Sequence, residues 1–182
     1  MLKPLIKIIF ALISIAYPFA VLYMLNMNME PRYMSAVFVI ILLAQLFNKK
    51  AGILKYIFIF ISFTMIILLI TINNSVITKL YPISINAALL FLFASSLKYP
   101  PSVVERIARI TTPDLPEEAV VYCVKVTKVW SLFFIINAVI SAVTVFMPVK
   151  IWVIYNGFIS YMVIGAIFVV EYIVRINVRE KL

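Results

Sequence analysis

Six long apolar runs follow one another along the chain, and short charged or polar segments separate them. Each run is close to the roughly 20 apolar residues with which a helix crosses the hydrocarbon core of a bilayer. Because hydrocarbon offers the backbone no water, each run must satisfy its own hydrogen bonds as a helix. The pattern predicts an all-α fold, a polytopic membrane helix bundle that forms one domain over residues 1–182, with transmembrane helices at residues 5–25, 31–47, 52–72, 80–97, 129–146 and 151–174.

Proline affects two of these predicted helices differently. Pro18 lies inside the first run, where its ring and missing N–H should kink the helix. Pro82 follows Tyr81 at the start of the fourth run, where a missing N–H costs nothing. The connections between runs are short, which favours antiparallel neighbours.

Lysine and arginine are unevenly divided between alternate connections. One set of connections, together with both chain ends, holds thirteen of them, and the other set holds three: Arg32, Lys79 and Lys150. Basic residues gather on the cytoplasmic side of membrane proteins. The bias therefore predicts that both termini are cytoplasmic, which six spans permit. No small-residue cleavage site follows the first run, so we expect a retained span rather than a signal peptide.

The composition agrees with a membrane protein and narrows its chemistry. Hydrophobic residues make up 65% of the chain and charged residues 13%. We expect the formal net charge of +9 to face anionic lipid headgroups, not nucleic acid. Histidine is absent, and the only cysteine, Cys123, is interpreted as a small apolar residue on a helix surface. Neither a metal, a cofactor nor a catalytic residue is indicated, so the sequence gives no support for an enzyme.

The segment between the fourth and fifth runs, residues 98–128, is the longest polar stretch. Its double proline, Pro100-Pro101, should end the fourth span, and Ser102 and Glu105 have the spacing of a capping box that starts a helix. One face of that helix is apolar and consists of Val103, Ile107 and Ile110. We predict a short interfacial helix between spans four and five that lies in the plane of the membrane surface.

Two arginines, Arg106 and Arg109, lie with Glu105 on the other side of this predicted helix. One interpretation is that they bind a phosphate, either of a lipid headgroup or of a lipid-linked intermediate. The alternative is that they anchor the helix at the interface.

A second helix start follows, where Asp114 and Glu117 repeat the capping spacing. No proline or glycine interrupts the chain from Glu117 to Phe146. We predict one helix of roughly 30 residues, about 45 Å long at 1.5 Å per residue. Since this exceeds the thickness of the hydrocarbon core, its first three turns should project into the cytoplasm.

Polar residues also occur inside the last two runs. Those of the fifth run share one helix face: Asn137, Ser141 and Thr144. Those of the sixth run are Asn156, Ser160 and Glu171. Antiparallel packing at equal depth places Asn137 near Ser160, and Ser141 or Thr144 near Asn156. This intramembrane polar cluster either joins the helices by hydrogen bonds or lines a shared cavity, and Gln45 and Asn86 are expected to join the same interior.

Glu171 is an acidic residue with long apolar runs on both sides of it. An ionisable residue within a span is a candidate functional residue. Arg175 lies one turn further on, and Lys128 should lie at a similar depth. Glu171 is therefore interpreted as an ion-pair partner of either one, with a proton or cation site as the alternative.

Five aromatic residues fall near the ends of predicted spans: Tyr33, Tyr81, Tyr99, Trp130 and Trp152. Tryptophan and tyrosine collect at membrane–water interfaces because their rings are amphipathic. We predict that these five form the aromatic belts.

Residues 99–175 contain the strings YPPSVVERIARITTPDLPEEAVVYCVKVTKVWSLFFIINA and WVIYNGFISYMVIGAIFVVEYIVR. They resemble a group of uncharacterised bacterial inner-membrane proteins found near genes for acyl or aryl-polyene lipid synthesis, which is distantly similar to the intracellular septation protein A family. The matching features are Pro101 with Arg106, Leu115-Pro116, Trp130, Asn137, Trp152, Asn156-Gly157 and Glu171. The resemblance implies a role in the cell envelope through partner proteins.

These observations predict a non-catalytic accessory or scaffold protein of cell-envelope or lipid biogenesis in the bacterial inner membrane. Its expected partners are the lipid bilayer, anionic lipid headgroups and other inner-membrane proteins, and it would bind partner membrane proteins or a lipid intermediate. The alternative is a small transporter or lipid flippase that uses the polar interior between spans five and six.

Overall fold

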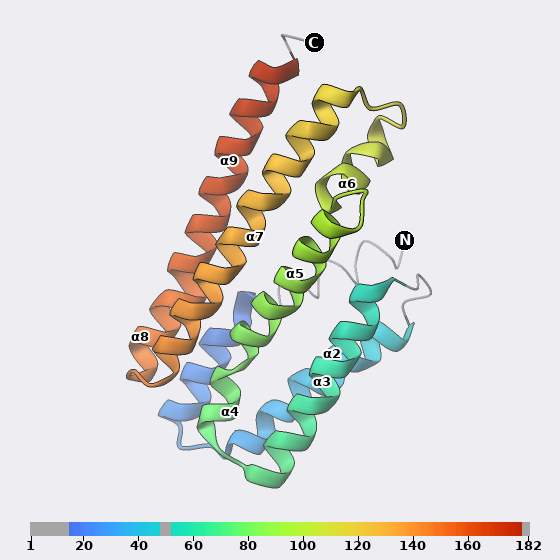
Figure 1. The fold of residues 1–182 in the computed structure, drawn as a ribbon. Coiled ribbons are helices and arrows are strands. Elements are labelled where there is room, and N and C mark those ends of the chain that lie inside the picture. The colour runs from blue at the N-terminus through green and yellow to red at the C-terminus, as the bar shows by residue number, and fades with distance from the viewer. Residues whose placement is uncertain (1–14, 48–51, 180–182) are drawn as a thin grey trace. The chain divides into compact units, whose positions relative to one another are not determined.

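The computed structural model describes residues 15–47 and 52–179, and every regular element in those residues is a helix (Figure 1). The predicted all-α class is thereby confirmed. The chain divides into two compact units, each described by itself below. The first unit comprises Met1–Ser84 and Ser141–Phe158, and the second comprises Ile85–Ile140 and Ile159–Leu182.

The helices follow in a simple order. A first helix at Ile15–Asn26 precedes η1 (Pro31–Met34), α2 (Ser35–Phe47), α3 (Ile53–Ile72), α4 (Ser75–Lys79), α5 (Tyr81–Lys98), α6 (Val103–Thr111), α7 (Glu117–Val145), α8 (Val149–Ile154), the π-turn η2 (Tyr155–Ile159) and α9 (Ser160–Arg179).

Four helical stretches are long and apolar enough to cross a membrane: Lys55–Ile72, Ser75–Lys98, Glu117–Val145 and Val149–Ile176. They correspond to the last four predicted spans. Two more apolar helices, Ile15–Asn26 and Pro31–Leu46, are shorter. They correspond to the first two predicted spans. Residues 5–14 of the first predicted span lie outside the described residues, and the predicted kink at Pro18 depends on them. The six-span topology with both termini cytoplasmic stays a prediction.

Three aromatic rings from separate helices form the core of the first unit. The ring centroid of Tyr17 lies 4.6 Å from that of Tyr81 and 5.7 Å from that of Phe38, and the rings of Phe38 and Tyr81 are 5.3 Å apart. All three side chains are buried. Tilted and edge-on contacts of this kind add stability beyond the buried area. Alongside this core, α2 and α3 pack against each other and against η1.

The start of α5 shows how Pro82 is accommodated. In an uninterrupted helix, an N–H at position 82 would bind the carbonyl of Thr78, and proline has no N–H. The Tyr17 hydroxyl donates to that carbonyl instead, at 2.7 Å. The indole N–H of Trp152 donates to the next carbonyl, that of Lys79, at 3.3 Å. The apolar stretch that corresponds to the fourth predicted span, and is long enough to cross a membrane, begins with α4, at Ser75, and not at residue 80 as predicted.

The second unit is built around α7. Its core consists of Val126, Trp130, Phe133 and Phe134. Apolar side chains of α5 and α9 pack against this core, with the rings of Phe93 and Phe134 5.1 Å apart. The helices α7 and α9 run side by side (Figure 1). They are antiparallel, because Tyr122 contacts Glu171 at one end and Asn137 contacts Ser160 at the other.

The long uninterrupted helix that the sequence predicts is α7, with 29 residues. It begins at Glu117, and the carbonyl of Pro116 accepts the first helical bond, from the N–H of Val120, at 3.1 Å. Asp114 lies too early in the chain to be the residue that precedes this helix, so its predicted capping role is wrong. Glu117 and Glu118 lie in the first turn, where the positive end of the helix dipole favours them.

The predicted aromatic belts need correction at three positions. Trp130, Trp152 and Tyr81 are buried within their units, whereas Tyr33 and Tyr99 are exposed. Trp130 is buried because its ring packs against those of Phe133, Phe134 and Phe168, at centroid distances of 5.8, 5.8 and 4.9 Å. Trp152 is buried and hydrogen-bonded to the backbone, as described above. Only Tyr33 and Tyr99 keep the exposure that an interfacial belt requires.

Candidate functional site

Helix α6 begins as predicted, at a cap made by Ser102. The Ser102 hydroxyl accepts a hydrogen bond from the backbone N–H of Glu105 at 3.3 Å. The N–H of Val103 donates to the Ser96 hydroxyl at 3.1 Å, which ties the helix to the last turns of α5. The cap therefore fixes the point at which the chain leaves α5 and turns into α6.

The isoleucines of α6 are exposed, whereas the apolar face of an amphipathic helix in a soluble protein is buried. Glu105 is only 6% exposed, whereas Ile107 is 60% and Ile110 is 80% exposed. Glu105 lies away from the isoleucines, as the sequence predicts, and its side chain is buried in the protein. The helix thus packs the Glu105 side inward and leaves its two isoleucines uncovered, an arrangement suited to lipid, which can cover apolar side chains.

The two arginines of α6 have different surroundings. The guanidinium of Arg109 pairs with the buried Glu105 carboxylate at 2.9 Å and donates to the carbonyl of Pro113 at 2.8 Å. Arg106 is exposed and bends back over the turn, donating to the carbonyls of Pro101 at 2.8 Å and Tyr99 at 3.4 Å. Arg109 is thus neutralised by Glu105, whereas Arg106 is exposed and has no ion-pair partner among the described residues.

Three buried polar residues of the second unit, Asn86, Asn137 and Ser160, form a chain of hydrogen bonds. The Asn137 amide nitrogen donates to the Asn86 side-chain oxygen at 2.9 Å, and the Ser160 hydroxyl donates to the Asn137 side-chain oxygen at 3.0 Å. The predicted contacts of Asn137 with Ser160 and of Asn86 with this interior are both present. Gln45 belongs to the other unit, where it is half-buried on α2.

The first unit holds a separate group of polar bonds. The Ser141 hydroxyl donates to the Asn156 side-chain oxygen at 2.7 Å. The Asn156 amide nitrogen donates to the Thr144 hydroxyl at 3.2 Å and to the Trp152 carbonyl at 3.0 Å. The sequence predicts that Asn156 contacts Ser141 or Thr144, and it contacts both. These bonds satisfy three of the four hydrogen-bonding positions of a buried amide.

A π-turn, Tyr155–Ile159, carries Asn156 and Gly157. Such turns are rare and are frequent at functional sites, and the apolar pattern of the sixth run does not predict this one. Gly157 is buried, and a Cβ at this position would lie 3.2 Å from the Cβ of Pro18 and 3.3 Å from the ring of Phe19. The missing side chain therefore lets the π-turn approach the first helix closely.

Glu171 is half-buried and lies between a tyrosine and an arginine. The Tyr122 hydroxyl donates to the backbone carbonyl of Glu171 at 3.1 Å and lies 3.4 Å from its carboxylate. The Arg175 guanidinium lies 3.7 Å from the same carboxylate oxygen. The predicted ion pair with Arg175 is therefore formed. Among the described ion pairs there is none to Lys128, because Lys128 lies about 240° around α7 from Tyr122 and is exposed.

Lys79 binds backbone carbonyls at the end of α7, a role that its sequence context does not reveal. Its ammonium group donates to the carbonyls of Val145 and Met147, at 3.1 Å each. The first carbonyl belongs to the last residue of α7 and the second lies two residues beyond it, where no further helical N–H is available. Lysine near a helix C-terminus is a known cap, but this lysine comes from a helix more than 60 residues away in the chain.

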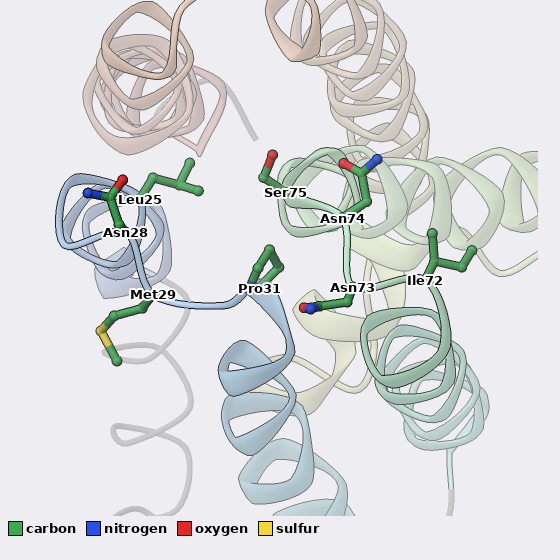
Figure 2. A pocket seen from close by; sticks show the side chains of 8 residues that line it. All are labelled: Leu25, Asn28, Met29, Pro31, Ile72, Asn73, Asn74 and Ser75. Carbon is green, nitrogen blue, oxygen red and sulfur yellow. The ribbon is translucent and has the colours of Figure 1, made fainter.

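A pocket of about 470 Å³ lies between two loops of the first unit (Figure 2). Asn28 and Asn74 stand on opposite sides of it in this view, and the Asn73 side chain is directed towards Pro31. Two amide oxygens here bind the backbone: that of Asn73 accepts the N–H of Arg32 at 2.9 Å, and that of Asn74 accepts the N–H of Val76 at 2.8 Å. The polar groups of this pocket therefore shape the loops.

Potential metal ligands do not gather anywhere in the described part of the chain: no three acidic or cysteine side chains come together there. Cys123 is buried, which corrects the prediction of a surface position. A scan against models of known protein families, a search of curated proteins and a search of solved structures gave no match. The structural evidence therefore defines an all-helical protein with four stretches long and apolar enough to cross a membrane, and its function must be argued from its surfaces.

Proposed function

We propose that the chain is a membrane-embedded accessory protein, not an enzyme, that binds anionic lipid or a lipid-linked intermediate through the surface of α6. The observation that carries the proposal is the uncovered face of α6, where Ile107 and Ile110 are exposed beside the exposed cation of Arg106. Apolar residues flanked by a basic side chain are typical of helices that lie at a membrane surface.

The place of α6 in the chain supports this proposal. It follows α5, the end of a stretch long enough to cross a membrane, after a turn of only four residues. Basic residues on this side of a membrane attract anionic lipids, with roughly 1 kcal/mol for each lysine or arginine near the surface. A location in the bacterial inner membrane and a role in cell-envelope or lipid biogenesis, together with partner membrane proteins, belong to the same proposal.

The alternative, a transporter or flippase, has weaker support. Its candidate residues bind one another: Asn137 with Asn86 and Ser160 in one unit, and Asn156 with Ser141 in the other. Glu171 is paired with Arg175. These side chains already have the partners that a passing substrate would have to replace, so they are better suited to holding helices together.

Spin labels on α6 test the proposal. In a Cys123→Ala background, a nitroxide at Ile110→Cys is expected to collide more with oxygen, which dissolves in lipid, than with a water-soluble nickel chelate in nanodiscs that contain phosphatidylglycerol. A label at Glu118→Cys, in the exposed first turn of α7, is the matched control and should favour the nickel chelate. Equal nickel accessibility at both positions would place α6 in water and overturn the proposal.

A further inference from the structure

A groove runs along α5 in the second unit. Seven residues between positions 87 and 99 line it, and its volume is about 550 Å³. Ala87, Phe91 and Ala94 are exposed along it. The two alanines leave space beside the phenylalanine ring, and the lining extends over roughly 17 Å at 1.5 Å per residue.

The polar groups of this α5 groove gather at one end. Ser95 donates its hydroxyl to the carbonyl of Leu92 at 3.0 Å, so it is engaged within the helix. The remaining polar lining residues are Lys98 and Tyr99, in the last turn of α5 and directly after it. The groove is therefore apolar for most of its length and cationic at the end that leads into α6.

Arg106 adds a second cation at this end. Its guanidinium donates to the carbonyl of Tyr99, and the ammonium group of Lys98 lies 5.4 Å from the centre of the Tyr99 ring. Neither Lys98 nor Arg106 takes part in any ion pair between described residues, whereas Arg109 is neutralised by Glu105. Lys98 and Arg106 are thus cations near this end of the groove that no described carboxylate neutralises.

We propose that the α5 groove and these two cations form a site for one anionic phospholipid. The phosphate would be bound between Lys98 and Arg106, and an acyl chain would lie along Ala94, Phe91 and Ala87. A lipid is the occupant that fits, because the groove lies on a membrane-spanning stretch, where the bilayer supplies hydrocarbon chains directly. This inference rests on the proposed function and names the class of its ligand and where that ligand binds. The phosphate would be bound by Lys98 with Arg106, and not by Arg109 with Arg106.

The test measures lipid bound to the full chain, purified in detergent, by native mass spectrometry during titration with phosphatidylglycerol or phosphatidylethanolamine. The unmodified chain should prefer phosphatidylglycerol. The double variant Lys98→Ala/Arg106→Ala should bind it about 30-fold more weakly, as expected for two surface cations. Lys125→Ala, which removes an exposed lysine of α7 outside the groove, is the matched control and should bind as the unmodified chain does.

A second pair of variants tests the groove separately from the charge. Ala94→Trp fills it while both cations remain, and Ala87→Phe does the same two turns away. Both positions are exposed, so thermal unfolding should be unchanged. We expect at least tenfold weaker binding of phosphatidylglycerol in each.

The outcomes separate the two proposals. If the charge variant loses binding and both groove-filling variants keep it, lipid binds only at the charged surface, which overturns the groove site and leaves the proposed function standing. If the headgroup alone, glycerophosphoglycerol, competes as well as the whole lipid, the acyl chain has no place in the site and the inference fails. If no form of the protein prefers phosphatidylglycerol, both proposals fail.

Discussion

At the scale of single residues, Gly157 shows how a missing side chain sets a helix contact. A Cβ at this position would lie 3.2–3.3 Å from atoms of Pro18 and Phe19, closer than most such contacts. Gly165, eight residues further along the chain, has no atom within 4 Å of the same hypothetical Cβ. The two glycines therefore form a matched pair within one apolar helical stretch, Val149–Ile176.

We predict that Gly157→Ala lowers the free energy of unfolding by about 1–3 kcal/mol, as small-to-large changes at packed positions do. Gly165→Ala should be neutral or stabilise the chain by up to about 1 kcal/mol, because alanine has the higher helix propensity. Unfolding in detergent micelles measures both changes. Equal effects of the two substitutions would contradict the close approach at Gly157.

The residue scale is also where prediction from the sequence succeeds and fails most clearly. Helical spacing and antiparallel depth predict the contact of Asn137 with Ser160, because polar groups in hydrocarbon turn to protein partners. The same spacing places Glu105 on the side of α6 away from its isoleucines but does not predict that Glu105 is buried, because spacing within one helix does not show which other helices cover that side.

At the scale of elements, hydrogen bonds between buried side chains join α7 to its neighbours in the second unit. Asn137 bonds both Asn86 of α5 and Ser160 of α9, so one amide connects three helices. Interhelical hydrogen bonds of this kind are worth roughly 0.6–2 kcal/mol each in membranes.

A double-mutant cycle with Asn137→Ala and Ser160→Ala tests how much this hydrogen bond contributes to stability. We expect a coupling energy of about 0.6–2 kcal/mol, measured from unfolding in mixed micelles. A parallel cycle that combines Asn137→Ala with Thr111→Ala, at an exposed position on α6, should give no coupling. Absence of coupling in both cycles would show that the bond between Asn137 and Ser160 contributes nothing to stability.

Local signals predict some elements of this fold and miss others. The cap at Ser102 and the uninterrupted run after Glu117 predict the starts of α6 and α7. The short helix α4 and the π-turn are not predictable in this way. The carbonyls at the end of α4 bind Tyr17 and Trp152, which are 61 and 73 residues away in the chain.

At the scale of the whole molecule, the distribution of basic residues predicts the topology, which cysteine accessibility can test. In a Cys123→Ala background, Asn28→Cys lies after the first helix, and Thr112→Cys lies after α6. We expect a membrane-impermeant maleimide to label position 28 in intact cells and position 112 only in permeabilised ones. Labelling of both positions in intact cells would contradict the predicted orientation.

The hydroxyl of Tyr17 bonds the carbonyl that Pro82 leaves without a helical partner. The identities of positions 17 and 82 should therefore change together during evolution. A descendant that replaces the proline regains the backbone donor and is then free to carry phenylalanine at position 17, whereas the loss of the phenol alone leaves an unsatisfied carbonyl. Covariation between two sites so far apart in the chain would record this exchange of one donor for another.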